Sequence, residues 1–226
     1  MKIISWNCNM AYRKKSEAIL SHKPDLLILQ ECSRADIENS DALFKHWVGS
    51  NPNKGLGVLG FSDFNFRVAD NYNDSLHWVI PIHSDVVDIL AIWAHRYPGK
   101  TYIEGMMDAL RHYDSMLSAD NTLFIGDMNN NVMWDGTNRP ELQWANYLEE
   151  LKARGKHSVW HAKSNDKHGE ESVSNLFMYR QPERGYHIDY VFASEGLIEQ
   201  SDIEIGAYED WLAHSVHVPI MLEIKS

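Results

Sequence analysis

The sequence is poor in several features that define whole classes of protein. Only 2 cysteines, Cys8 and Cys32, occur among its 226 residues, which excludes a disulfide framework. No apolar run is long enough to span a bilayer, and the short apolar start of the chain does not resemble a signal peptide. We therefore expect a cytoplasmic protein without stable membrane association.

Linkers and repeats are also missing. No Pro/Ser/Gly-rich stretch, low-complexity tract or repeat of fixed period interrupts the chain. The length suits one domain of good size, and a hydrophobic content of 44% with 8 Trp is enough for a sizeable core. We therefore expect a single domain over residues 1–226. Because no feature indicates a protein partner, we expect a monomer.

Positive charge is scarce. The chain has 21 Lys and Arg against 32 Asp and Glu, which gives a formal net charge of −11. This excludes a general nucleic-acid coat protein, whose affinity would come from a basic surface. It does not exclude a nuclease, because an acidic cluster that holds a divalent cation contributes to the same sum.

The sequence does contain short apolar runs that end abruptly in polar residues. The run Thr122–Ile125 leads into Gly126, Asp127 and Asn129. An apolar run bounded by polar residues predicts a buried strand, and Gly126 predicts a sharp turn where that strand stops. In α/β folds ligands bind outside strand ends, although Asp and Asn also favour turns for local reasons. Residues 130–131 are assigned to the turn only.

The same pattern occurs twice near the start of the chain. One strand is predicted over Lys2–Asn7, and a second, Leu26–Leu29, leads directly into Glu31. Between them, Arg13–Leu20 predicts a helix. A strand–helix–strand succession favours parallel strands. We therefore expect Asn7 and Glu31 at the same edge of a sheet.

Further strands and helices are predicted along the rest of the chain. Strands separated by Asn, Asp and Gly suit an antiparallel meander over residues 55–60, 64–68, 76–82 and 86–94. The spacing of apolar residues and a Pro–Gly boundary predict helices over residues 102–117 and 140–155. Later strands are predicted over residues 186–192, 202–205 and 218–224.

The polar stretch between His157 and Ser174 contains further histidines at 161 and 168. These histidines suggest a zinc site, but their spacing matches no tight ligand pattern. A solvated surface loop is the favoured interpretation.

Five short motifs, each at a predicted strand end, follow one another in the order Trp6–Asn7, Gln30–Glu31, Gly126–Asn129, His187–Tyr190 and Ser215–Pro219. This series resembles the endonuclease/exonuclease/phosphatase superfamily, which includes DNase-like enzymes, abasic-site endonucleases, sphingomyelinases and inositol polyphosphate phosphatases. The resemblance spans nearly the whole chain. It implies an α/β fold, a four-layer sandwich of two packed mixed β-sheets flanked by helices, with the active site at one rim.

The resemblance implies a metal site and a water-activating group. Glu31 resembles the main carboxylate ligand of a Mg²⁺ or Mn²⁺ ion, with Asn7 beside it, and oxygen ligands suit these hard cations. Asp127 resembles the residue that orients or deprotonates the attacking water. Asn129 resembles an amide donor to the phosphate, and Asn7 is a second candidate for substrate binding.

The resemblance also implies acid–base partners. His217 resembles the strand-end histidine that contacts the scissile phosphate, and Asp189 resembles the carboxylate that fixes its tautomer. Either Asp127 or His217 takes the proton of the water. His95 lies where DNase-like members have a second histidine proposed as general acid. Repair-type members have a tyrosine in that loop, so Tyr97 remains an alternative.

The comparison with the family pattern also involves two basic residues and one position at which this chain differs from that pattern. Lys54 and Arg13 are candidate phosphate contacts. The family usually has Ser-Asp-His before its last strand, whereas this chain has Val216 between the serine and the histidine. The missing carboxylate puts a second metal subsite, and with it full activity, in question. His214 is a candidate replacement of low weight.

These observations predict a divalent-metal-dependent phosphodiester hydrolase that acts by in-line attack of water at phosphorus. The favoured substrate is DNA or RNA. One alternative is a phosphatase or phosphodiesterase for a small or lipid-headgroup phosphate, which the acidic net charge favours slightly. The other is a weakened or non-catalytic binding member of the family, which the valine at 216 suggests.

Overall fold

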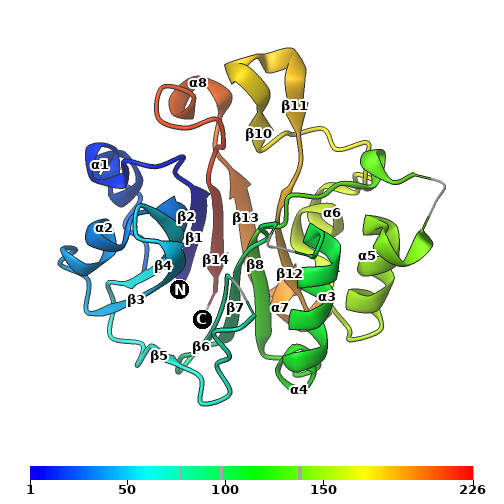
Figure 1. Cartoon of the computed structure of the whole chain (residues 1–226), viewed down its shortest axis with the longest axis horizontal. Coiled ribbons are helices and arrows are strands. Elements are labelled where there is room, and N and C mark those ends of the chain that lie inside the picture. The colour runs from blue at the N-terminus through cyan, green and yellow to red at the C-terminus, as the bar shows by residue number, and fades with distance from the viewer. Residues whose placement is uncertain (77, 97–98, 137–138, 226) are drawn as a thin grey trace.

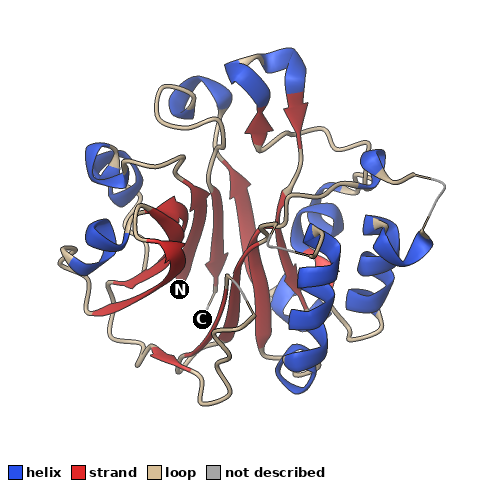
Figure 2. Ribbon diagram, in the orientation of Figure 1, coloured by secondary structure: helices blue, strands red, loops and turns tan. Residues whose placement is uncertain are grey.

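Two six-stranded sheets pack face to face, with helices on their outer sides (Figures 1 and 2). The protein is represented by a computed structural model that describes residues 1–76, 78–96, 99–136 and 139–225. This architecture confirms the predicted four-layer α/β sandwich.

The first sheet is mixed and has the strand order β13-β14-β1-β2-β4-β3. β1 runs parallel to β2, which confirms the predicted parallel pair, and the other pairs are antiparallel. The strands are β1 (Lys2–Asn7), β2 (Leu26–Cys32), β3 (Phe44–Asn51), β4 (Lys54–Gly60), β13 (Ser201–Ile205) and β14 (Ile220–Ile224). β3 was not predicted.

The second sheet is also mixed, with the order β5-β6-β7-β8-β12-β9 and one parallel pair, β7 with β8. Its strands are β5 (Arg67–Val68), β6 (Val79–His83), β7 (Asp88–Trp93), β8 (Thr122–Asp127), β9 (His157–Ser158) and β12 (Asp189–Ala193). The predicted four-strand meander is therefore wrong in part. Its first strand, β4, belongs to the other sheet, and only β5, β6 and β7 form an antiparallel run.

The helices are short and cover the outer faces of the two sheets. They are α1 (Ser16–Leu20), α2 (Arg34–Glu38), α3 (Tyr102–His112), α4 (Asp114–Leu117), α5 (Trp144–Lys152), α6 (Val159–Ser164), α7 (Glu195–Glu199) and α8 (Tyr208–Trp211). Two of them, α6 and α7, instead contribute Val159, Leu197 and Ile198 to the core between the sheets. Single 3₁₀ turns are η1 (Tyr12–Lys14), η2 (Val132–Trp134), η3 (Pro140–Leu142), η4 (Met178–Arg180) and η5 (Pro182–Arg184). Each of the three predicted helices is thus divided into two shorter pieces. No helix in the described part of the chain is long and apolar enough to cross a membrane.

The alternation of side chains along the strands determines which polar groups lie between the sheets. Ile3 of β1 and Ile125 of β8 belong to the apolar core between the two sheets. Residues two apart on a strand point to the same face, so Asn7 and Asp127 also face the space between the sheets, at the rim where both strands end. The fold therefore directs polar side chains of the two sheets toward one another.

Gly126 has a different role from the predicted turn. It lies within β8, which continues through Asp127. Its φ is +146°, and a Cβ at this position would lie 1.9 Å from the carbonyl oxygen of Ile92 on β7. Only glycine allows this close approach of β7 and β8, so its function is strand packing beside the site.

The predicted surface loop over residues 157–174 is folded in part. His157–Ser158 forms the edge strand β9, and Val159–Ser164 forms α6, which packs against β12. Val159 and Ser158 are buried. Polar composition misled the prediction, because hydrogen bonds among the polar side chains replace apolar contacts here.

Candidate active site

Three side chains meet where β8 and β12 reach the rim. Asp127 and Asp189 are direct register partners on neighbouring antiparallel strands, which brings their carboxylates side by side. His217, in the segment before β14, places its Nδ1 2.9 Å from Oδ2 of Asp189. One donor atom from each residue lies within 4.8 Å of the others. We call Asp127, Asp189 and His217 the rim cluster.

The rim cluster is buried and well hydrogen-bonded. Asp127 is 0% exposed, Asp189 3% and His217 6%. Asn7 donates from Nδ2 to Oδ2 of Asp127 at 2.9 Å, and the backbone N–H of Asn129 donates to Oδ1 at 2.9 Å. Contacts from both sheets therefore fix the orientation of the Asp127 carboxylate.

Burial and neighbouring charges shift the pKa values of the rim cluster. Burial raises the pKa of Asp127 to about 7, and the adjacent Asp189 carboxylate adds to this increase. Burial also opposes a positive charge on His217, but its contact with Asp189 outweighs that cost and raises the pKa of His217 to about 9. At neutral pH these shifts favour a charged His217 ring beside an Asp127 carboxyl near its midpoint.

His217 is fixed by its backbone as well as by its ring. Ser215 donates from Oγ to the carbonyl of Asn7 at 2.7 Å and accepts the N–H of His217 at 3.1 Å. The indole N–H of Trp6 donates to the carbonyl of His217 at 3.0 Å. Since Nδ1 faces Asp189, Nε2 is the ring nitrogen left for a substrate.

Glu31 lies at a bulge in β2. Alternation would place it with Leu29 on the helix-covered face, but the pairing with β4 shifts register between Gln30 and Cys32. Glu31 itself has a φ of +60°, a conformation that costs free energy in residues other than glycine and is concentrated at functional sites. Its carboxylate lies 3.0 Å from Nζ of Lys54.

The donors around Glu31 fit a hard divalent cation. The Glu31 side chain is 19% exposed, and Oδ1 of Asn7 accepts one N–H, from Asn9 at 3.1 Å, which leaves a second lone pair. Carboxylate and amide oxygens are ligands that Mg²⁺ and Mn²⁺ accept. A cation at Glu31 would take over the neutralisation that Lys54 provides. The negative charge of Glu31 also contributes, less than Asp189 and Asp127, to the raised pKa of His217.

Asn129 and His95 lie on the same side of the rim. Asn129 donates from Nδ2 to the carbonyl of Ala94 at 2.9 Å, which leaves its second amide hydrogen for another acceptor. His95 follows Ala94 directly, and its ring packs on Trp93 with 4.7 Å between centroids. Tyr97, the alternative to His95, lies outside the described residues.

The two predicted basic contacts differ in position. Lys54 pairs with Glu31 at the rim, as described above. Arg13 instead places its guanidinium 3.6 Å from Asp36, with a side chain that is 69% exposed. Lys15, two residues farther along, donates from Nζ to the carbonyl of Cys8 at 2.5 Å. Lys15 is therefore a basic residue of this segment that contacts the backbone just after Asn7.

Position 216 offers no acid. The carbonyl of Val216 accepts the N–H of Phe177 at 2.8 Å, and its side chain is half-buried. His214 packs on Trp211, with 6.1 Å between ring centroids. Within the described residues His214 does not belong to the rim cluster, so it does not replace the missing carboxylate.

Asn175 is a buried positioning residue that the sequence did not indicate. Its Nδ2 donates to the carbonyl of Asp189 at 2.7 Å, and its Oδ1 accepts the N–H groups of Ile188 and Asp189 at 2.8 and 3.0 Å. Its own carbonyl accepts the N–H of Val218 at 2.9 Å. Asn175 thereby joins β12 to the segment that carries His217. In a polar stretch, an asparagine of this kind cannot be distinguished from a turn residue.

The fold and the rim cluster together describe an α/β sandwich protein with buried acids and a histidine at one rim. The model of the Endonuclease/Exonuclease/phosphatase family matches residues 4–207. The chain belongs to this family.

Several solved structures share this fold. The 3′–5′ exonuclease NExo from Neisseria meningitidis is 17% identical, with a TM-score of 0.72 over 100% of both chains. The 3′ phosphatase NExo from Neisseria bound to a product DNA hairpin is 17% identical, with a TM-score of 0.71 over 100% of both chains. The AP endonuclease LMAP from Leishmania major is 15% identical, with a TM-score of 0.72 over 100% of this chain and 87% of the other. In a comparison with curated proteins by sequence, the chain has no significant match.

Proposed function

We propose that this chain is a divalent-metal-dependent phosphodiester hydrolase with a nucleic acid as substrate. The observation that carries the proposal is the rim cluster beside Glu31. It combines a buried acid, an imidazolium and an oxygen donor set for a cation within one rim. Membership of a family of hydrolytic nucleases and phosphatases supports this chemistry.

Asp127 is the general base in this proposal. Its pKa of about 7 allows it to take a proton from water at neutral pH, where a matched pKa is most effective. The two donors from Asn7 and Asn129 hold both carboxylate oxygens. The attacking water is therefore bound in a defined direction.

His217 stabilises the negative charge that grows on the phosphoryl oxygens during attack. Asp189 holds its ring and keeps it protonated, so Nε2–H acts as a donor that needs no reorganisation. The second amide hydrogen of Asn129 donates to the same group. His95 protonates the leaving oxygen, with Tyr97 as the alternative acid.

Glu31 and Asn7 would hold the metal ion. Mg²⁺ or Mn²⁺ bound there supplies positive charge that neutralises the phosphoryl group and polarises it toward attack. Lys54, now paired with Glu31, becomes free to contact a phosphate. Arg13 remains a more distant candidate for the same contact.

A projecting hairpin supports a nucleic acid as substrate. β10 (Leu176–Phe177) and β11 (Gly185–Tyr186) rise beyond the end of the sheets (Figure 1), and Leu176 bridges to His217 at the rim. Tyr179 near the tip is 70% exposed, and the guanidinium of Arg184 lies 5.3 Å over its ring. Exposed aromatic and cationic side chains suit base stacking and contacts to a phosphate backbone.

A small or lipid-headgroup phosphate is the second candidate substrate, because the net charge of −11 opposes long polyanions. Salt distinguishes the two candidates. Nucleic-acid binding weakens steeply as salt rises, since each phosphate contact releases counterions. Turnover of a small phosphoester depends on salt far less.

The test is a substrate panel assayed with Mg²⁺, with Mn²⁺ and with EDTA. The panel contains supercoiled DNA, single-stranded DNA, RNA, bis-p-nitrophenyl phosphate and a lipid headgroup ester. We expect metal-dependent cleavage of at least one nucleic acid, abolished by EDTA. Cleavage of the small esters alone would favour the second candidate, and cleavage that persists in EDTA would contradict the metal.

A further inference from the structure

We propose that His161, His168 and Glu171 form a binding site for a divalent transition metal of the zinc type, separate from the rim. One donor atom from each residue lies within 4.8 Å of the others. Two histidines and one carboxylate are a donor set typical of zinc and related metals, whereas Mg²⁺ prefers oxygen alone. We call these three residues the His–Glu cluster.

The distances suit one shared ion. Zinc bonds of about 2.0–2.1 Å in a tetrahedron separate two ligand atoms by roughly 3.3 Å. The rings of His161 and His168 already lie 3.6 Å apart, centroid to centroid. Nε2 of His161 is 3.2 Å from Oε1 of Glu171. The ring planes are 23° apart, so the rings would have to rotate out of this stack for all three donors to face one point.

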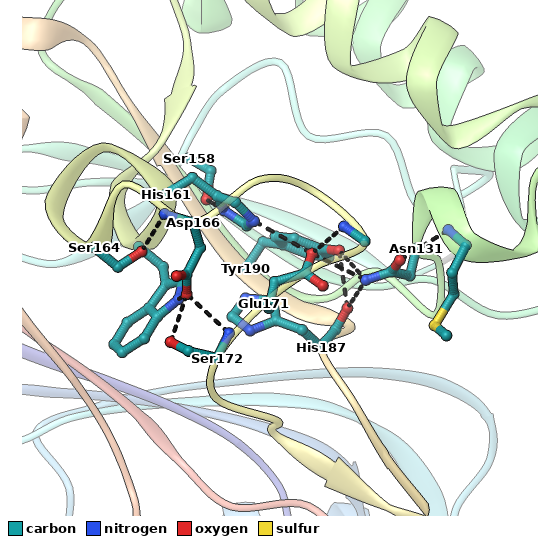
Figure 3. Close-up of polar contacts among 12 residues, drawn as sticks. Asn131, Ser158, His161, Ser164, Asp166, Glu171, Ser172, His187 and Tyr190 are labelled. Carbon is teal, nitrogen blue, oxygen red and sulfur yellow. Dashed lines mark hydrogen bonds and ion pairs between the residues drawn. The ribbon is translucent and has the colours of Figure 1, made fainter.

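Outer contacts orient two of the three ligands (Figure 3). Ser158 is 2.7 Å from Nδ1 of His161, which turns Nε2 toward Glu171. Oε1 of Glu171 accepts from the backbone of Gly169 at 2.9 Å and from Nδ2 of Asn131 at 3.1 Å. The Ser158 contact lies on the far side of the His161 ring, as is characteristic of metal sites in proteins. The Glu171 contacts instead fall on Oε1, the oxygen that also faces His161, and they fix the position of this carboxylate.

The loop that carries Glu171 is held closed by a second set of bonds. Asp166 accepts from the indole N–H of Trp160 at 3.0 Å, and from the backbone and hydroxyl of Ser172 at 3.0 and 2.7 Å. Figure 3 shows these bonds of Asp166 beside His161 and Glu171. The ligand loop is therefore organised by its own contacts, which lowers the entropy lost when an ion binds.

Unpaired nitrogens point to a missing partner. Within the described residues, Nδ1 of His168 is buried without a hydrogen-bond partner, and so is Nε2 of His187. His187 is only 2% exposed, and its ring lies 5.4 Å from that of His161. A buried nitrogen without a partner costs free energy. A metal ion would provide a partner for the His168 ring. It would also account for the close approach of the two imidazole rings.

An open coordination position is available. His161 and His168 line a cavity of about 690 Å³ together with Lys156, Ser158 and Phe192. Three protein ligands beside a cavity leave room for a water or another small ligand as the fourth. The inferred site is therefore not closed in the manner of a purely structural Cys₄ site.

The His–Glu cluster is connected to the rim cluster through Asn131. Its Nδ2 reaches Glu171 and also donates to the carbonyl of His187 at 2.9 Å, and His187 lies two residues before Asp189. Asn131 is 1% exposed, so it is a buried connecting residue in addition to the turn residue that the sequence predicts. An ion at the His–Glu cluster would stabilise the segment that supports β12. Zinc binding itself does not depend on the proposed hydrolysis.

The experiment is a zinc titration of the metal-stripped chain by calorimetry, with thermal unfolding as a second readout. We expect one zinc event that survives Glu31→Gln, and a melting temperature higher by roughly 5–10 °C at a hundredfold excess of zinc over the Kd. His168→Asn and Glu171→Gln should each weaken that event at least tenfold. His157→Asn is the matched control, because His157 lines the same cavity outside the cluster, and it should bind as the unaltered chain does.

Two results would overturn the site. One is wild-type zinc affinity in both His168→Asn and Glu171→Gln, which would place the ion elsewhere. The other is the lack of any binding or thermal stabilisation of the unaltered chain by zinc. The second readout uses the unaltered chain alone, so it remains decisive if a variant fails to fold. Loss of hydrolysis with intact zinc binding would count against the proposed function and not against this site.

Discussion

The rim cluster and the His–Glu cluster contain similar residue types. They differ in whether hydrogen bonds within the protein satisfy their polar atoms. Each gathers three protein groups whose donor atoms lie within 4.8 Å of one another. In the rim cluster, both oxygens of Asp127 and Nδ1 of His217 have partners within the protein. In the His–Glu cluster, Nδ1 of His168 has none among the described residues.

This difference separates two kinds of site. The rim cluster is held by strand register and by donors from two sheets, so its geometry exists before any ligand arrives, as charge stabilisation in a transition state requires. The His–Glu cluster lies on a short helix and a loop, and its unpaired nitrogen is satisfied only by an added group. We therefore assign chemistry to the first and ion binding to the second.

The largest expected effect comes from Asp127→Asn. Removal of the general base should lower kcat/KM about 10²–10⁴-fold with Mg²⁺. The matched control is Asp88→Asn. Asp88 also pairs with a histidine, since its Oδ1 lies 2.7 Å from Nδ1 of His83, but this pair is remote from the rim. Steady-state kinetics on the best substrate of the panel measures both. Equal activity of the two variants would remove the rim cluster from the chemistry.

Asn175→Ala should destabilise the fold. The substitution orphans buried backbone groups of Ile188 and Asp189, and we expect a loss of about 2–4 kcal/mol in the free energy of unfolding. Urea denaturation measures this loss. Asn146→Ala, at an exposed position of α5, should change stability by less than about 0.5 kcal/mol. Equal urea denaturation curves for the two variants would show that Asn175 does not position β12.

Glu31→Gln should act on the metal requirement. Loss of the carboxylate charge should raise the Mg²⁺ concentration for half-maximal activity roughly 10–100-fold. A metal titration of the rate checks this, with Glu38→Gln on the exposed side of α2 as control. An unchanged Mg²⁺ requirement would place the ion on other residues.

The pH profile sharpens the assignment of roles. Asp127 must be deprotonated and His217 protonated, so activity should rise as pH passes about 7 and fall as pH passes about 9. Asp189→Asn removes the charge that raises the pKa of His217, and the alkaline limb should then move to lower pH. A profile whose alkaline limb stays in place in this variant would contradict the imidazolium.

The smallest effect is expected for Val216→Asp. The rim cluster is complete without an acid at this position, so activity should change by less than about threefold. A gain of tenfold or more would show that the valine weakens the site and would favour a binding role for the natural chain. The same kinetic assay provides the answer.

The sequence predicts the strand ends better than it predicts how they meet. Asn7 and Glu31 were expected at one edge, and the parallel register of β1 with β2 places Asn7 opposite Gln30. The direct pairing of Asp127 with Asp189 depends on register between distant strands, which periodicity does not contain. The roles of these residues remain predictions.

Other features lie beyond any local pattern. The positive φ of Glu31 arises from a bulge against β4, and nothing in the neighbouring sequence marks it. The sequence did not predict the His–Glu cluster, because its members come from a helix and a loop that fold back on one another. Their spacing along the chain matches no short motif, although their side chains lie together. Conversely, polar composition predicted a loop over all of this stretch, although residues 157–164 form β9 and α6.

The most direct test of the account follows the oxygen atom of the attacking water. Single-turnover cleavage of a defined oligonucleotide with Mg²⁺ in ¹⁸O-enriched water should place one ¹⁸O on the phosphate of the product, and EDTA should abolish the reaction. Label in the sugar hydroxyl, or no cleavage of DNA or RNA with either Mg²⁺ or Mn²⁺, would contradict hydrolysis at phosphorus by the rim cluster.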